Sequence, residues 1–308
     1  MSSSENHSPT GISISDLINL LLQKKITILF VTFFSAMISV GTSLYLPNVY
    51  TSQSIIAPTV IDNSISNSLG GYSSIAGLVG INIPNKSQNK SDEAIERIKS
   101  YDFFVEEFIP NIKFQDLVAY KRWDSASNEI IYKEKIYKNN KWVISKKLGI
   151  PSIPSEQEAF KVYKKLLNIV EDPQSTFVTI EISHVSPYIA KEWLELIINN
   201  INNYMREIDK EIAKNSVDFL QATAKETSIS QIKTVISKLI ENHVQTLTLV
   251  ESNEYYIFRP ISSPIVPEEK SGPLRALICI FGTMLGFLLS IFSIFFLHTY
   301  KSKKINIL

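Results

Sequence analysis

The sequence predicts an α+β membrane protein in which two transmembrane helices flank a single large domain. Residues 26–46 and 276–297 are uncharged and apolar, and each stretch is long enough to cross the hydrocarbon core of a bilayer as a helix. The residues between them, 47–275, must therefore lie on one side of the membrane. This part mixes strand-like alternation with helix-like periodicity, which predicts an α/β base near the membrane and a long projecting helix.

The expected organisation has five parts, and its orientation depends on lysines at the outer flanks. Residues 1–25 and 298–308 are short terminal segments outside the two spans. Lysines precede the first span and follow the second at positions Lys24, Lys25, Lys301, Lys303 and Lys304. The positive-inside rule therefore predicts cytoplasmic termini and a domain on the opposite side. The first span is too long for a cleavable signal peptide and ends in Tyr-Leu-Pro, so we expect an uncleaved anchor.

Charge and cysteine content restrict the possible partners of the domain. Residues 47–275 carry 26 basic and 28 acidic residues, which argues against nucleic acid as a partner. The only cysteine, Cys279, lies inside the second span, so no disulfide is expected in the domain.

Local patterns predict the elements of the domain. Alternation and turn residues indicate strands over 49–57, 177–184 and 255–260, and a hairpin of 130–138 with 141–145 about Asn139-Asn140. Ser91 is a candidate N-cap for a helix reaching Ile109. Ser155 and Glu158 form a capping-box pattern for a helix reaching Val170. The first and last strands are expected to pair, which would bring the two spans together.

The most regular segment is residues 187–250. Apolar residues recur there every three or four positions, with no glycine or proline after Pro187. We favour one long helix over about 187–250, with a bend near 227–230. A helical hairpin is the alternative, although turn residues are absent from the middle.

Two further segments are unusual in composition. Residues 63–89 form an apolar, glycine-rich loop, read either as a contact surface or as a solvated linker. Its glycines are Gly70, Gly71, Gly77 and Gly80. A proline-rich juxtamembrane segment precedes the second span, and it contains Pro260, Pro264, Pro267, Pro273 and Arg275. Prolines at this density predict a stiff, extended approach to the membrane.

No catalytic, nucleotide-binding or metal-binding motif is present in the sequence, so we expect neither an enzyme nor a cofactor. The histidines, including His184 and His243, are interpreted as structural. One motif does suggest a mechanism. Gly282 and Gly286 form G-x-x-x-G in the second span, which lets another helix approach closely. The expected partner is the first span, with Ser35, Ser39 and Gly41, or a span of another protein.

The chain resembles the polysaccharide co-polymerases, specifically the kinase-less, O-antigen branch of the Wzz-type chain-length determinants. The resemblance covers nearly the whole chain. It is carried by ISISDLINLLLQKK, YTSQSIIAPT, SLGGYSSIAGLVGI, DEAIERIKSYDFFVEEFI and, above all, FRPISSPIVPEEKSGPLRALICIFGTMLG. Larger relatives add a cytoplasmic tyrosine-kinase domain, for which the residues after the second span leave no room.

The resemblance implies a non-enzymatic inner-membrane protein with a periplasmic domain and cytoplasmic termini. Its implied partners are itself, in a ring-like homo-oligomer, membrane lipid and the O-antigen polymerase, with undecaprenyl-linked glycan as a further candidate. Its implied function is to set the modal number of repeat units in lipopolysaccharide. The alternatives are a transmembrane adaptor for capsule or exopolysaccharide synthesis that works with a separate kinase, and a tethered glycan hydrolase. Glycan contacts would come from exposed aromatic and polar groups. The sequence does not select among Tyr120, Trp123, Trp142 and Trp193, although Trp193 is expected in the core.

Overall fold

The computed structural model describes residues 21–59, 90–144 and 153–305, with side chains described as far as residue 296. The chain forms two compact units. One unit comprises residues up to 48 together with those from 271 onward, and the other comprises residues 49–270. We call them the apolar unit and the domain, and each is described by itself.

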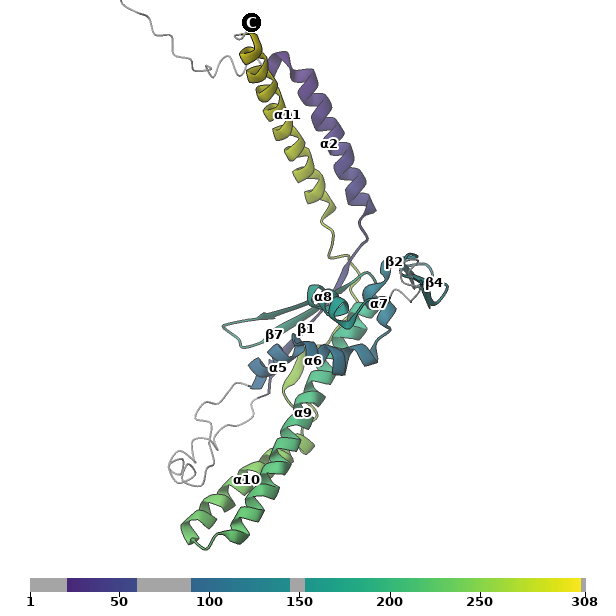
Figure 1. Cartoon of the computed structure of the whole chain (residues 1–308). Helices are drawn as coiled ribbons and strands as arrows, with labels where there is room; N and C mark the ends of the chain where they lie inside the picture. Colours follow the sequence, from purple (N-terminus) through teal and green to yellow (C-terminus); the bar gives the residue numbers. More distant parts are fainter. Residues whose placement is uncertain (1–20, 60–89, 145–152, 306–308) are drawn as a thin grey trace, which may run out of the picture. The chain divides into compact units, whose positions relative to one another are not determined.

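The apolar unit consists of two long helices packed side by side (Figure 1). Helix α2 spans Lys25–Tyr45 and helix α11 spans Arg275–Ile305. Both are long and apolar enough to cross a membrane. Their outer faces are largely exposed apolar side chains such as Phe33, Phe34 and Phe281, as expected for helices whose surroundings are lipid. The two predicted apolar helices at the ends of the chain are confirmed.

The domain is built on a four-stranded antiparallel sheet with the order β6-β7-β1-β8. The strands are β1 (Tyr50–Pro58), β6 (Leu167–Glu171), β7 (Val178–His184) and β8 (Phe258–Ser262). In β7 every second residue, from Val178 to His184, is buried, as its sequence alternation predicts. The first and last strands do pair, with Ile56 opposite Pro260. Pro260 is compatible with the sheet because β8 is an edge strand.

Helices cover the buried face of this sheet. They are α5 (Lys90–Ile98), α6 (Tyr101–Phe103), the π-helical η1 (Phe104–Phe108), η2 (Ile109–Asn111), α7 (Phe114–Val118), α8 (Glu156–Leu166) and the first half of α9 (Pro187–Glu226). The core contains Ile95, Phe104, Phe108, Tyr163, Ile180, Trp193 and Ile197, all at most 3% exposed. The expected placement of Trp193 in the core is therefore confirmed, and the mixed α+β class holds.

Two small antiparallel pairs form a separate lobe of the domain, which we call the β lobe (residues 120–142). Strands β2 (Tyr120–Asp124) and β3 (Glu129–Tyr132) pair, as do β4 (Tyr137–Lys138) and β5 (Lys141–Trp142). The turn predicted at Asn139-Asn140 is present, and both residues have positive φ, as a two-residue hairpin turn requires. The first predicted arm is wrong, because it divides into β3, which pairs with β2, and β4.

Two helix ends predicted from sequence are also wrong. The helix expected from Ser91 to Ile109 is interrupted at Ser100, whose side chain accepts a bond from the Phe103 amide and starts a new helix. Ser91 itself lies within α5. The capping box of Ser155 and Glu158 is present in both directions. However, α8 stops at Leu166 because the following residues join the sheet as β6.

The long helix is present but shorter than predicted. Helix α9 has 40 residues and ends at Glu226, and α10 (Ser230–Ser252) folds back along it (Figure 1). The single helix over 187–250 is therefore wrong, and the helical hairpin is correct. Thr227 and Ile229 adopt extended backbone conformations at the predicted position of the bend. Folding back is favourable because it buries Leu220 of α9 against Val235, Ile236 and Leu239 of α10.

Candidate functional site: the helix pair and the base of the hairpin

The two glycines of the G-x-x-x-G motif lie at the contact between α2 and α11. A Cβ atom added at Gly282 would overlap the side chain of Ser39, and one added at Gly286 would overlap that of Ser35. Ser35 Oγ also donates a 2.9 Å hydrogen bond to the carbonyl of Gly282. Gly41, in contrast, has nothing within 4 Å of an added Cβ. Small residues on both helices therefore permit close approach of the two backbones.

A polar contact joins the ends of the same two helices. Arg275, the first residue of α11, donates from Nη2 to Asn48 Oδ1 at 2.9 Å, and Asn48 follows α2 by three residues. This contact joins the two helices at one end, and the serine–glycine contacts join them further along. Of the predicted juxtamembrane residues, Arg275 and Pro273 belong to the apolar unit.

The remaining prolines belong to the domain. Pro260 lies in β8, Pro264 is buried and Pro267 is half-buried. Buried serines of β1 hold this stretch in place, because Ser54 Oγ donates to Ser262 O at 2.6 Å and Ser52 Oγ donates to Ile265 O at 2.8 Å. The chain that leaves β8 is therefore fixed to the strand that begins the domain.

A buried asparagine joins α9 to the last strand. The side chain of Asn202 donates to the carbonyls of Ile198 and Phe258 and accepts from the amides of Ile257 and Phe258, at 2.9–3.0 Å. All four hydrogen-bonding positions of the amide are used, as burial requires. In the sequence Asn202 is visible only as a polar residue among the apolar positions Ile198, Ile201 and Met205, and that pattern does not identify its partners.

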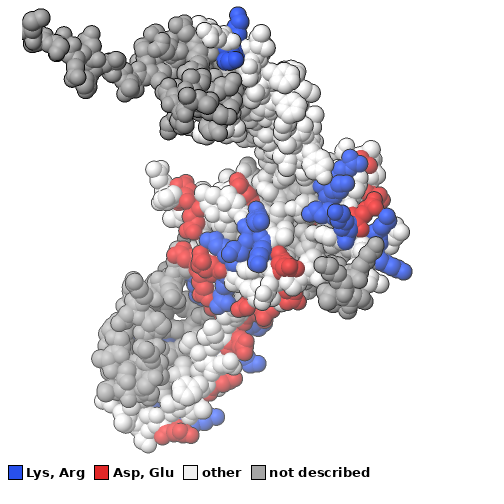
Figure 2. Space-filling model, turned by 45° about the horizontal axis from the view of Figure 1, so that its top comes forward, with Lys and Arg blue, Asp and Glu red and all other residues white. Residues whose placement is uncertain are grey.

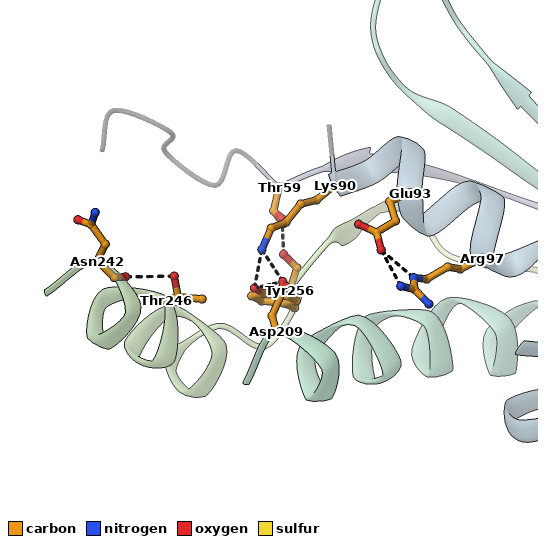
Figure 3. A network of polar contacts seen from close by, with 8 residues as sticks. All are labelled: Thr59, Lys90, Glu93, Arg97, Asp209, Asn242, Thr246 and Tyr256. Atoms are coloured by element: carbon orange, nitrogen blue, oxygen red, sulfur yellow. Dashed lines mark hydrogen bonds and ion pairs between the residues drawn. The ribbon is translucent and has the colours of Figure 1, made fainter. Parts of the chain in front are cut away.

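A second polar cluster lies nearby, at the base of the hairpin (Figure 3). Tyr256 donates from its hydroxyl to Asp209 Oδ2 at 2.5 Å, and Lys90 forms an ion pair with the same carboxylate. Thr59 Oγ1 donates to the backbone carbonyl of Tyr256 and, at 3.1 Å, to that of Ile257. Burial, followed by the neighbouring Asp209 carboxylate, raises the pKa of Tyr256 far above its usual value. The phenol therefore stays protonated and acts as a donor.

This cluster gathers residues from four parts of the chain. Thr59 follows β1, Lys90 starts α5, Asp209 lies in α9, and Tyr256 precedes β8. Arg206 adds a further link, since its Nη2 donates to the carbonyls of Asn253 and Glu254 at 2.8 Å. The two segments that lead into and out of residues 60–89 are thus both fixed at the base of the hairpin. The glycines Gly70, Gly71, Gly77 and Gly80 lie outside the described residues.

His184 and His243 lie on separate elements of the domain. The buried His184 ring contacts the carbonyl of Asp116 at 3.0 Å through Nε2 and accepts from the Ser186 amide at 3.1 Å through Nδ1. Burial lowers the pKa of His184 to about 4 despite these bonds. His243 lies in the separate helix α10. No group of three or more metal-ligating side chains occurs among the residues the structure describes.

The outer part of the hairpin exposes large apolar side chains. Ile212 and Phe219 of α9 are 55% and 62% exposed, and Ile229 and Val244 are about half exposed. The space-filling view shows that white, uncharged surface interrupts the charged groups along this region (Figure 2). In the described part of the chain, the hairpin has no neighbour that covers these residues.

The chain matches the model of the Wzz chain length determinant protein family over residues 10–113. The matched range contains α2, β1, α5 and the helices up to η2, and it confirms the resemblance to the Wzz family. The kinase-less, O-antigen branch stays a prediction. The quoted sequence from Phe258 to Gly286 lies beyond the matched range. No curated protein matches the chain.

Similar solved structures include polysaccharide co-polymerases. A full-length bacterial polysaccharide co-polymerase is 13% identical with a TM-score of 0.43, and the match covers 94% of this chain and 99% of that one. A fragment of WzzB from Salmonella Typhimurium is 14% identical with a TM-score of 0.32, covering 73% of this chain and all of that one. A mutant of the Shigella flexneri O-antigen chain-length regulator is 11% identical with a TM-score of 0.22, covering 72% of this chain and all of that one.

Proposed function

We propose that this protein regulates polysaccharide chain length, acting with an inner-membrane O-antigen polymerase to set the modal number of repeat units in lipopolysaccharide. The observation that carries the proposal is the match to the chain length determinant family over residues 10–113. The architecture is compatible with it, because two apolar helices at the ends of the chain anchor a single domain. The protein would act as a scaffold and not as a catalyst.

The proposed location is the bacterial inner membrane, with both termini in the cytoplasm and the domain in the periplasm. The lysines outside the two spans support this orientation. Because Cys279 is the only cysteine, a Cys279→Ser background allows single cysteines to be placed at Ser4 or at Lys214. A membrane-impermeant thiol reagent applied to intact spheroplasts should label the cysteine at 214 and spare the one at 4. The opposite pattern would invert the topology.

We also propose that the protein works as a homo-oligomer. The support comes from Ile212, Phe219, Ile229 and Val244, which leave an apolar surface on the hairpin. Isolated exposed apolar residues are ordinary, but a group along one hairpin favours a covering neighbour. Identical copies placed side by side would supply that neighbour at every interface of a closed ring.

The glycine contacts should matter for this function. We expect the double substitution Gly282→Leu and Gly286→Leu to weaken length control, because neither side chain fits against Ser39 and Ser35. Gly41→Leu is a matched control in the same helix pair, since an added Cβ at Gly41 meets nothing within 4 Å. Normal glycan lengths at normal levels of the double variant would show that close helix approach is not required.

The primary test is a gel of surface lipopolysaccharide from cells with and without the gene. We expect a cluster of bands around one length to become a smooth ladder biased to short chains. Complete loss of polymer would instead support the adaptor that works with a separate kinase. An unchanged ladder would contradict lipopolysaccharide as the regulated glycan.

A further inference from the structure

We propose that the β lobe binds anionic phospholipid headgroups at the surface of the membrane that holds α2 and α11. The lobe has a composition distinct from the rest of the domain. Residues 120–142 contain six basic and three acidic residues, whereas the rest of 47–275 contains 20 basic and 25 acidic residues. A positively charged region on an otherwise acidic domain favours a negatively charged partner.

The positive charge is exposed and gathered in one place. Lys121, Lys133 and Lys135 line a hollow of about 480 Å³ together with Glu134 and Ile136. All three lysines are exposed, and none forms a salt bridge with another described residue. Glu134 is instead paired with Lys138 at 2.8 Å. Figure 2 shows basic side chains gathered over the part of the surface that carries the lobe.

Aromatic side chains accompany these lysines. The lobe contains Tyr120, Trp123, Tyr132, Tyr137 and Trp142, all partly exposed. The Lys133 ammonium lies 5.5 Å from the ring centre of Tyr120. Tryptophan and tyrosine beside lysine and arginine is the combination enriched where proteins meet the headgroup region of a bilayer.

The covalent chain keeps the lobe close to an apolar helix. The Trp123 ring packs edge-on against Tyr50, with ring centres 5.6 Å apart. Tyr50 follows Tyr45, the last residue of α2, by five positions, and five extended residues span at most about 18 Å. The lobe therefore cannot move far from the end of a membrane-spanning helix, whatever the arrangement of the two units. This short tether favours the membrane surface over a soluble anion as the occupant.

The test uses the full chain reconstituted into vesicles and its own tryptophans. The three tryptophans are Trp123, Trp142 and Trp193, and only Trp193 is buried. A spin label on the lipid headgroup quenches tryptophans at the surface, and the variant Trp123→Phe with Trp142→Phe gives the baseline from Trp193. We expect quenching of the lobe tryptophans to be at least twofold stronger in phosphatidylglycerol-containing vesicles than in pure phosphatidylcholine, and to fall in high salt.

Charge removal provides the decisive comparison. The triple variant Lys121→Gln, Lys133→Gln and Lys135→Gln should lose the dependence on phosphatidylglycerol, since each lysine near an anionic surface contributes about fivefold in affinity. The matched control replaces Lys214, Lys225 and Lys233, three exposed lysines of the hairpin, and should behave like the parent. Equal quenching in both lipids would overturn the proposal. The proposal would also be overturned if quenching in the parent did not depend on lipid charge and the triple variant changed oligomer size, because the lobe would then contact another copy.

Discussion

The two halves of α9 are parts of one helix but are held in place differently. From Ala190 to Met205 the helix packs on the sheet and contributes most of its buried residues to the main core. Beyond Asp209 only Ala213 and Leu220 are buried, and the packing partner is α10. The inner half is thus stabilised within one chain, whereas the outer half leaves Ile212 and Phe219 exposed. The exposed apolar side chains of the outer half are the surface that the proposed homo-oligomer would cover.

The largest expected effect is in the inner half, at Asn202. Asn202→Ala would leave the buried amides of Ile257 and Phe258 without their acceptor. We expect the free energy of unfolding to fall by about 3–4 kcal/mol, since each unsatisfied buried donor costs roughly 1–3 kcal/mol. Urea unfolding of the detergent-solubilised chain measures this change. The exposed neighbour Asn203 is the control, and an equal loss in Asn203→Ala would contradict the proposed role of Asn202.

A cavity in the outer half should have a smaller and more local effect. Leu220→Ala removes a side chain that packs on Val235, Ile236 and Leu239. We expect a loss of about 2 kcal/mol, at the low end for such substitutions because the small cluster can relax. Hydrogen exchange should show faster exchange in the hairpin and unchanged protection in β7. Loss of protection in β7 would mean that the two halves unfold together.

The core beneath the inner half should also respond to pH, through His184 of β7, whose ring centre lies 4.9 Å from that of Trp193 in α9. Its pKa is about 4 in the folded domain and about 6.5 when unfolded, so the unfolded chain binds more protons between these values. Stability is therefore complete above pH 6.5 and is lost as the pH falls toward 4. Between pH 7.5 and 5 we expect a decrease of about 1–2 kcal/mol in the free energy of unfolding. His184→Gln should flatten this dependence, and an unchanged slope would assign it to other groups.

The smallest effect on stability should accompany the largest effect on assembly. Ile212→Ser with Phe219→Ser changes exposed positions, so we expect the stability of the subunit to change by less than about 0.5 kcal/mol. Light scattering in detergent should nevertheless show a smaller oligomer. Glu211→Ser with Lys214→Ser is the control on the same stretch of α9 and should leave the oligomer intact. If both double variants assemble normally, the neighbour contacts another surface.

The features that the sequence predicts correctly depend on residues close together in the chain. The capping box of Ser155 and Glu158 and the alternation in β7 are complete within a few residues, so both were found. The turn of the hairpin has no local sequence signal, because Thr227–Ile229 contains no glycine, proline or asparagine. The position of the turn is instead favoured by the burial of Leu220 against residues of α10, which come later in the sequence. Local propensity cannot report such a tertiary gain.

The residues of the candidate site also fall into those that a local sequence pattern marks and those that meet only in the folded domain. The G-x-x-x-G pattern marked Gly282 and Gly286 because a spacing of four residues is itself the signal. The cluster of Lys90, Asp209 and Tyr256 carried no such signal, since Lys90 and Asp209 are separated by 119 positions and meet only in the folded domain. Asn202 lay between these cases, because a polar residue within an apolar stripe is visible in sequence but its partners are not.

The attachment of Thr59 and Lys90 to Tyr256 has a consequence for loop length. Both residues are held at Tyr256, so contacts of the domain bring together the two ends of the segment between them. For such a closed loop, doubling the length costs only about 0.6 kcal/mol of closure entropy. Changes in the number of residues between Thr59 and Lys90 should therefore cost the domain little stability, as long as both attachments to Tyr256 are kept.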